Sequence, residues 1–360
     1  MDNYHALQQI LDTHPSGAPK APAFDRILRI LFSEEEAALA VEMSFTGKTA
    51  EEIAQRSGAD VKAASELLEG MANKGIVYAR EKKGVTKYSL LPTIPGLFEF
   101  PFMNGMNTPE LKELGTLWNE YKHQGQAEAF AGDPTPQMRV VPVNQSVQGV
   151  TNIHPYDEVH SFIENADYIS VTDCACRVTM QKCDRPTDVC MIFGSAGRFL
   201  VERGFAREVT KDEARHTLDR AEEAGLVHTS NNSKDRANLI CNCCPCCCTI
   251  LRGKTEFGLD TAFMESRFMA TVNEEECTGC AVCVDDRCPV GAVTMNEAVA
   301  VVNQEDCIGC GLCVSGCPSD AMEMAARPGE IPTPETVQEM AATVLQEKGK
   351  LDEFMKVMKK

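Results

Sequence analysis

Eight cysteines in the C-terminal third of this 360-residue chain recur at short, regular intervals, and this spacing constrains the fold more than any other feature. They form two runs, Cys277-x2-Cys280-x2-Cys283-x4-Cys288-Pro289 and Cys307-x2-Cys310-x2-Cys313-x3-Cys317-Pro318. The runs are offset by 30 residues, so the segment is an internal repeat. A thiolate at every third residue lets one tight loop surround three corners of a metal cluster, and the fourth thiolate then comes from the other run.

This segment closely resembles the bacterial-type ferredoxin domain with two [4Fe–4S] clusters, and the resemblance covers residues 268–327. It implies that one cluster is bound by Cys277, Cys280, Cys283 and Cys317, and the other by Cys307, Cys310, Cys313 and Cys288. The chain departs from the family pattern once, because four residues rather than three separate Cys283 from Cys288. Zinc is the alternative metal, but eight cysteines without a histidine in this doubled spacing disfavour it.

The charge of the repeat predicts electron transfer at low potential. Residues 268–327 contain ten acidic and two basic side chains, a net charge of −8. Negative charge around a cluster disfavours the addition of an electron, and it also attracts a basic redox partner. A ferredoxin-like domain has no substrate chemistry of its own, so the resemblance implies that it passes single electrons.

Residues 151–260 contain the other ten cysteines, in one group of four and one group of six. These are Cys174, Cys176, Cys183 and Cys190, then Cys241, Cys243, Cys244, Cys246, Cys247 and Cys248. Clustered thiols in such numbers oxidise easily unless they bind a metal. The simplest division assigns each group to its own site, the first being a four-thiolate site. One larger or irregular iron–sulfur centre shared by both groups is the alternative, and structural zinc is another.

The adjacent cysteines of this region resemble the cysteine-rich modules of heterodisulfide-reductase-type proteins, although the spacing does not reproduce their motif. Arg177 follows the Cys174–Cys176 pair and is expected to offset thiolate charge. His228 precedes the second group and is either a ligand or proton donor, or a hydrogen-bonded structural residue. His154 and His160 are weaker candidates of the same kind.

Residues 22–100 contain no cysteine and predict a small helical domain. Ser33 and Asp60 are expected to cap helices, a further helix is expected to end at Gly58, and residues 76–90 predict a hairpin. Three helices and a hairpin in this order resemble a winged helix-turn-helix. Ten basic and eleven acidic side chains over residues 24–92 give a net charge of −1. This balance disfavours DNA binding and favours docking or dimerisation.

The sequence predicts an α+β, multi-domain chain with a winged-helix-like domain, a Cys-rich α/β middle domain, a ferredoxin-like domain and a C-terminal helix. Two further regions belong to this chain. Residues 101–150 form a connecting region whose apolar stripe between Leu111 and Tyr121 predicts a packed helix. Residues 328–360 form a helical tail that either docks on its own chain or binds a partner.

Composition narrows the function further. The net charge of −18 opposes unaided binding to nucleic acid or to an anionic membrane. No run of apolar residues is long enough for a membrane span, and no signal peptide is evident, so a cytoplasmic, reducing compartment is expected. The sequence has no phosphate-binding loop of the nucleotide-binding families, so electrons are expected to come from another protein.

The domain arrangement resembles multi-domain 4Fe–4S binding proteins of anaerobic bacteria and archaea. It implies an iron–sulfur electron-transfer protein of anaerobic metabolism, with redox protein partners, two [4Fe–4S] clusters and at least one further cluster or zinc. A component of an oxidoreductase is expected rather than a stand-alone enzyme, and the alternatives for its assembly are a homodimer and a subunit of an oxidoreductase complex. The alternatives are a redox-sensing DNA-binding regulator and a reductase with a catalytic cluster in the middle domain.

Overall fold

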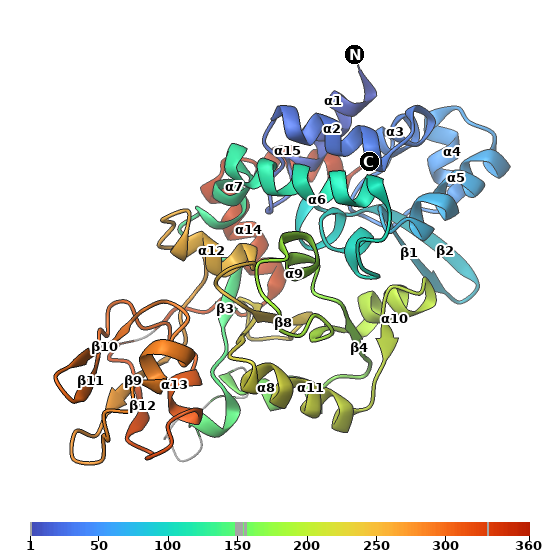
Figure 1. Ribbon diagram of the computed structural model, residues 1–360. Coiled ribbons are helices and arrows are strands. Elements are labelled where there is room, and N and C mark those ends of the chain that lie inside the picture. The colour runs from blue at the N-terminus through green and yellow to red at the C-terminus, as the bar shows by residue number, and fades with distance from the viewer. Residues whose placement is uncertain (1, 148–153, 155–156, 330) are drawn as a thin grey trace.

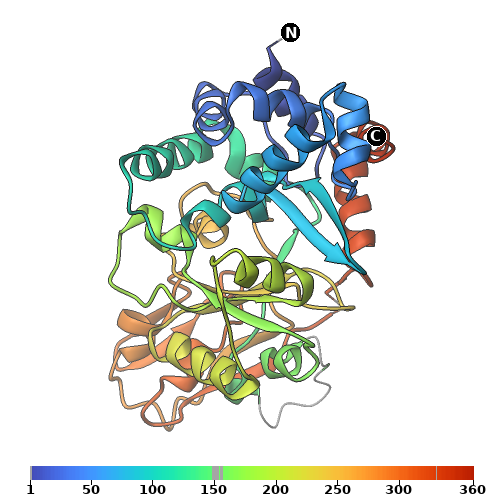
Figure 2. The same cartoon turned by 90° about the vertical axis from the view of Figure 1, so that its right-hand side faces the viewer.

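The computed structural model describes residues 2–147, 154, 157–329 and 331–360, and it shows an α+β chain built from several parts (Figure 1). The N-terminal helices lie at one end, a six-stranded sheet lies in the middle, and the cysteine repeat lies at the other end (Figures 1 and 2). Within the described residues, every helix is too short or too polar to cross a membrane.

The N-terminal helices begin where the sequence places their caps. Ser33 and Glu36 form a capping box at one helix, Thr49 and Glu52 form one at the next, and Asp60 caps the third. A hairpin follows, so three helices and a hairpin occur in the predicted order. The elements of this part are α1 (Asn3–Leu11), α2 (Pro22–Leu31), α3 (Glu34–Val41), α4 (Ala50–Ser57), α5 (Val61–Asn73), β1 (Val77–Lys82) and β2 (Val85–Leu90).

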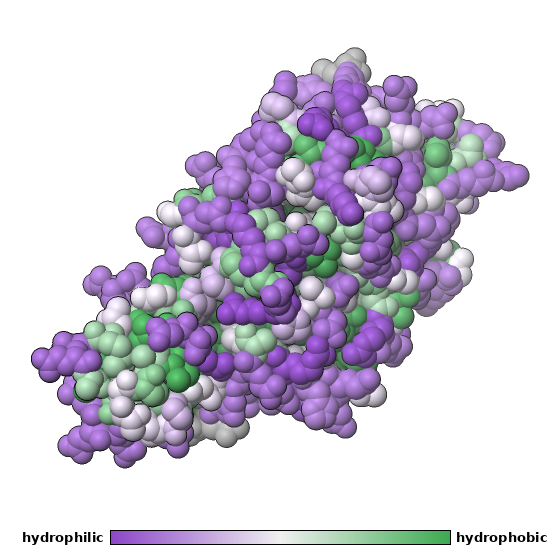
Figure 3. Space-filling view, viewed as in Figure 1, coloured by the Kyte–Doolittle hydropathy of each residue, from purple (hydrophilic) through white to green (hydrophobic). Residues whose placement is uncertain are grey.

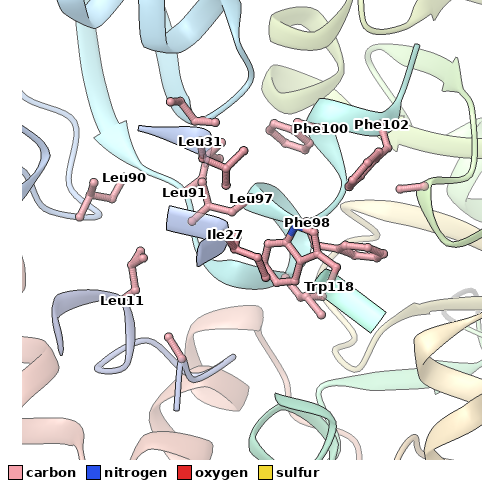
Figure 4. Close-up of a cluster of buried hydrophobic side chains, with 14 of the residues drawn as sticks. Leu11, Ile27, Leu31, Leu90, Leu91, Leu97, Phe98, Phe100, Phe102 and Trp118 are labelled. Carbon is pink, nitrogen blue, oxygen red and sulfur yellow. The ribbon is translucent and has the colours of Figure 1, made fainter. Parts of the chain in front are cut away.

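Helices α1, α2 and α6 (Pro109–Tyr121) lie outside that order and complete the N-terminal core. The Tyr4 hydroxyl of α1 donates to the Phe32 carbonyl (3.1 Å). Helix α6 lies in the predicted connecting region, and its Trp118 packs edge-on against Phe24 of α2. Figure 4 shows Trp118 among the apolar side chains of this core. The predicted stripe is therefore a packing surface. Short helical segments flank α6 in the sequence. They are η1 (Thr93–Leu97) and η2 (Phe100–Phe102) before it, and η3 (Lys122–Gln126) and α7 (Ala127–Ala131) after it.

The middle part is built on an antiparallel sheet with the strand order β3-β7-β8-β5-β4-β6. Two of its inner strands, β5 and β8, carry cysteines. Its elements are β3 (Met138–Val140), η4 (Asn144–Val147), α8 (Val159–Glu164), β4 (Ile169–Thr172), α9 (Ala175–Met180), β5 (Cys190–Phe193), α10 (Gly194–Glu202), β6 (Arg207–Glu208), α11 (Lys211–Glu223), β7 (Val227–Asn231), β8 (Leu239–Cys243) and α12 (Thr249–Thr255).

The cysteine repeat folds as two matching halves, each made of a strand, a short helical turn and a second strand. Each of its two-stranded sheets takes one strand from each half. Its elements are β9 (Phe268–Val272), η6 (Cys283–Arg287), β10 (Val293–Asn296), β11 (Val299–Val302), α13 (Leu312–Ser315) and β12 (Met322–Ala326). Strand β9 pairs with β12, and β10 pairs with β11. The residue added before Cys288 is taken up in η6 as a π-turn, in which the Cys288 N–H donates to the Cys283 carbonyl (3.1 Å). The extra residue therefore widens one helical turn.

The C-terminal helices α14 (Val337–Glu347) and α15 (Leu351–Met358) lie beside the N-terminal helices (Figures 1 and 2). The Lys350 ammonium is 2.7 Å from the Asp12 carboxylate, and the Phe354 ring stacks on Phe45 with ring centroids 5.9 Å apart. The tail thus docks on its own chain, which is the first of the two alternatives drawn from the sequence.

Candidate metal centres

The eight cysteines of the repeat surround two separate cavities. The first is lined by Cys277, Cys280, Cys283 and Cys317. The second is lined by Cys288, Cys307, Cys310 and Cys313. The structure therefore brings these cysteines together in the same two sets that the ferredoxin resemblance implies, while their role as ligands stays a proposal.

Backbone amides point at sulfur atoms around both cavities, as they do around bound clusters. The Ala292 N–H donates to Cys288 Sγ (3.2 Å), and the Ala270 N–H donates to Cys307 Sγ (3.5 Å). Burial opposes ionisation of Cys317, but hydrogen bonds from Ser319 and from the amides of Met322 and Ala321 together outweigh it and lower the pKa of this thiol. Burial raises the pKa of Cys310 to about 12, so that thiol needs a metal to remain deprotonated at neutral pH.

Glycines allow the cysteine loops to approach neighbouring backbone closely. Gly309 has φ +68°, and a Cβ there would lie 2.0 Å from the Phe268 carbonyl oxygen. Gly279, its counterpart in the first run, has φ +70°, and a Cβ there would lie 2.7 Å from the Ala298 carbonyl oxygen. Only glycine fits both the left-handed backbone and the close approach.

Four thiols of the middle part form a compact set, which we call the four-thiol site. The sulfur atoms of Cys183, Cys244, Cys246 and Cys247 all lie within 4.8 Å of one another. Cys183 Sγ is 3.9 Å from the sulfur atoms of both Cys244 and Cys247. The last three come from the turn between β8 and α12, and Leu226 and Val189 pack against the set. Four convergent thiols suit a tetrahedral metal or the four corners of a cluster.

Arg177 of α9 supplies positive charge to this site from a buried position. Its Nη1 is 3.9 Å from Cys244 Sγ and donates to the Asn242 carbonyl (2.7 Å), while its Nε donates to the Pro186 carbonyl (2.8 Å). A hydrogen bond from Cys247 and the charge of Arg177 outweigh burial and lower the pKa of Cys244 to about 4. Cys244 thus favours the thiolate that metal binding requires, whereas burial and Cys183 raise the pKa of Cys246, and Cys244 and burial raise the pKa of Cys247.

The other six middle cysteines form a second group, which we call the six-thiol group. Its members are Cys174, Cys176, Cys190, Cys241, Cys243 and Cys248. They come from the start of α9, the start of β5, strand β8 and the N-cap of α12. The sulfur atoms of Cys243 and Cys248 are 3.0 Å apart.

The simplest division of the middle cysteines, one site for each sequence group, does not match this geometry. Cys183 leaves the first group and joins three cysteines of the second, while Cys174, Cys176 and Cys190 join the other three. The reason is local. Cys241 and Cys243 alternate along β8 and share one side, whereas the turn that follows directs Cys244 to the opposite side. Each site therefore draws on both sequence groups.

The histidines that the sequence singled out lie outside these sites. His228 on β7 is 2% exposed, and its Nδ1 is 2.5 Å from the Asn242 Oδ1. Burial lowers the pKa of His228 to about 4, so His228 is a neutral, hydrogen-bonded structural residue. This is the second of the two interpretations that the sequence allowed for it. His154 and His160 belong neither to the four-thiol site nor to the six-thiol group.

Sequence reasoning missed two ionisable residues beside the six-thiol group, the buried Lys122 and the half-buried Glu99. The Lys122 ammonium lies 4.0 Å from the centroid of the Phe98 ring, and burial lowers its pKa while the Cys176 and Cys248 thiols oppose that shift. Burial, reinforced by Cys176, raises the pKa of Glu99 to about 8. The available signal was spacing, since Lys122 follows Trp118 by four residues and so shares its buried helical face.

Taken together, the two-fold cysteine repeat and its paired cavities define an iron–sulfur protein with a ferredoxin-type domain. Residues 269–318 match the family model of the 4Fe–4S dicluster domain. No curated protein matches the chain. The dicluster domain and the Cys-rich site in the middle support iron–sulfur electron transfer as the general activity.

Proposed function

We propose that this chain passes single, low-potential electrons between a redox protein partner and a further centre in its middle part, as a component of anaerobic metabolism. The observation that carries the proposal is the pair of four-cysteine cavities within the matched domain. Each cavity is assigned one [4Fe–4S] cluster, held by the four cysteines that line it. The four-thiol site is assigned a third metal centre.

The burial of the two cavities suggests a direction for the electrons. In the first cavity Cys280 is exposed, whereas in the second Cys307, Cys310 and Cys313 are buried. The second cavity also faces the rest of the chain, because the Val143 N–H donates to the Cys310 carbonyl (2.9 Å). A partner therefore docks at the first cavity. Figure 3 shows apolar residues gathered at this end of the molecule, with hydrophilic residues on its projecting edges.

The end of α11 joins the repeat to the four-thiol site. Arg287, next to Cys288, donates from Nη1 to the Glu223 carbonyl (3.3 Å) and from Nε to the Leu312 carbonyl (2.9 Å). Three residues beyond Glu223, Leu226 packs against the thiols of the four-thiol site. These contacts support a path from the second cavity to the middle part.

Contacts of α5 disfavour the alternative of a DNA-binding regulator. At the end of α5 the Lys74 ammonium binds the Glu36 carboxylate (2.7 Å), and Glu69 of α5 binds Arg203, the residue that follows α10 (2.6 Å). Lys62, which remains at the surface, lies 3.9 Å from Glu66. A recognition helix needs such groups free for bases and phosphates. Because these charged groups are paired within the chain, they support a role of α5 in packing against other parts of the chain rather than in binding DNA.

The location proposed is the cytoplasm. All eighteen cysteines are unbridged, which suits a reducing compartment.

The test is metal and sulfide analysis of anaerobically purified protein, together with electron paramagnetic resonance (EPR) after reduction by a low-potential donor. Cys313→Ala should lose one ferredoxin-type cluster, about four irons, and leave the four-thiol site intact. Cys183→Ala, the matched control, should keep both ferredoxin signals and lose the third centre. Unchanged iron content in Cys313→Ala, or an unmodified protein that the donor fails to reduce, would contradict the proposal.

A further inference from the structure

The six-thiol group is a closed ring of side chains. Each thiol interacts with two others, in the order Cys174, Cys176, Cys248, Cys243, Cys241, Cys190 and back to Cys174. In one of these pairs Cys248 Sγ donates to Cys243 Sγ (3.0 Å). Strand pairing supports the last part of this order, because Met191 of β5 lies opposite Ile240 of β8, which places Cys190 beside Cys241. The ring therefore follows from the fold as well as from the thiol contacts.

The ring is separate from the four-thiol site. The thiol contacts within the ring include none of Cys183, Cys246 and Cys247. Two of the ring thiols also contact hydroxyl groups. Thr249 Oγ1 is 3.7 Å from Cys176 Sγ, and Thr229 Oγ1 is 3.4 Å from Cys243 Sγ.

Two buried cations flank the ring with nitrogen atoms left unpaired. Arg177 Nη2 and Lys122 Nζ have no hydrogen-bond partner within the described part of the chain, and each residue is 2% exposed. Arg177 interacts electrostatically with Cys174 and Cys190, and Lys122 with Cys176 and Cys248. The cations thus lie beside different arcs of the ring. A buried cation is costly unless an anion balances it.

Arg177 also faces Cys244 of the four-thiol site, and Lys122 also faces Glu99. Neutral thiols or three disulfides in the ring would still leave both cations without a negative partner on the side that faces the ring, whereas metal-bound thiolates supply one. Six thiolates also exceed the four corners of a cubane. We infer that the ring binds one polynuclear iron–sulfur centre through all six cysteines, larger or more open than a cubane and distinct from the four-thiol site. This assignment stands independently of the proposed electron path, because it concerns what the ring binds and not the partner that reduces it.

The test uses two ring positions that lie opposite each other. Cys190→Ala and Cys248→Ala in the full chain, purified without oxygen, should each lose the same Mössbauer and EPR signal and the same number of irons. Cys246→Ala, in the same loop but in the four-thiol site, should keep that signal. The ferredoxin signals report that each variant is folded.

Three results would overturn the inference. They are different signals lost by the two ring variants, zinc in place of iron at the ring, and disulfides between ring cysteines in metal-replete protein.

A second measurement requires no change to a cysteine. Lys122→Met should move the midpoint potential of the ring centre to a more negative value, because a buried positive charge is removed. Lys122→Arg should keep it close to that of the unmodified protein, and the ferredoxin potentials should not move in either variant. An unmoved ring potential in Lys122→Met would refute the balance of charge on which the inference depends.

Discussion

Removing the charge of Arg177 should lower the reduction potential of the four-thiol site. Arg177 Nη1 is 3.9 Å from Cys244 Sγ, and the side chain is sealed from water. The change to test is Arg177→Gln, which keeps an amide donor for the Asn242 carbonyl but removes the positive charge. Arg177→Lys is the matched control because it keeps the charge.

The size of the effect follows from the distance. With an effective dielectric constant of about 20 and about 7 Å to the centre of a cluster, a unit charge changes the energy of an added electron by about 2 kcal/mol. For a one-electron couple this corresponds to about 100 mV. Loss of the charge destabilises the reduced state, so the midpoint potential of Arg177→Gln should be more negative by that amount.

The assay is a redox titration of anaerobically purified protein, followed by EPR. The two ferredoxin signals serve as an internal standard and should keep their potentials. Arg177→Lys should move the potential of the four-thiol centre by less than half as much as Arg177→Gln. A potential that stays fixed or becomes more positive in Arg177→Gln would refute the reasoning, and so would a site that holds no iron.

Three further predictions concern stability. Gly309→Ala should lower the free energy of unfolding by at least about 3 kcal/mol and abolish binding of one cluster, because its Cβ would lie 2.0 Å from the Phe268 carbonyl oxygen. Gly291→Ala, which has φ +68° but open space around it, should lower the free energy of unfolding by about 1–2 kcal/mol, as measured by urea unfolding. Burial, with Lys348 nearby, lowers the pKa of His14 to about 3, so below the ordinary histidine pKa the unfolded chain binds a proton that the folded chain does not, and the stability decreases as the pH is lowered. Between pH 7.5 and pH 5 the unmodified protein should lose about 2 kcal/mol more stability than His14→Gln. Equal losses in the two proteins would contradict this. Chelating the iron should expose residues 268–327 to limited proteolysis before the N-terminal helices, and uniform digestion would count against it.

The two sets of cysteines in the repeat could be predicted because the cysteine pattern is local. Three cysteines of each run lie within one loop, so their spacing alone brings them to one cavity. The fourth follows from the repeat, since Cys317 and Cys288 each end a run and cross to the other half. Helix starts at Ser33 and Asp60 were equally local, because a cap depends on the next few residues.

The middle sites could not be predicted in the same way, because their grouping depends on tertiary pairing. Cys183 and Cys244 are 61 residues apart and meet only after the sheet has formed. Which side of β8 each cysteine faces depends on register, and a shift of one residue would exchange the two sites. The role of Lys122 was hidden for a related reason, since nothing in the sequence of α6 shows that the Cys-rich turn covers its buried face.

The docking of α14 and α15 on the N-terminal helices also determines how the repeat is attached. Residues 268–327 leave the body and return to it, and the Arg327 N–H donates to the Arg267 carbonyl (2.8 Å) where the two crossings meet. The ferredoxin-type domain is thus an insertion held at both of its ends, rather than an appendage on a tether. In the proposed function, electron transfer to the middle part would therefore proceed across fixed separations, and the external partner would supply the motion by diffusing to and from the protein.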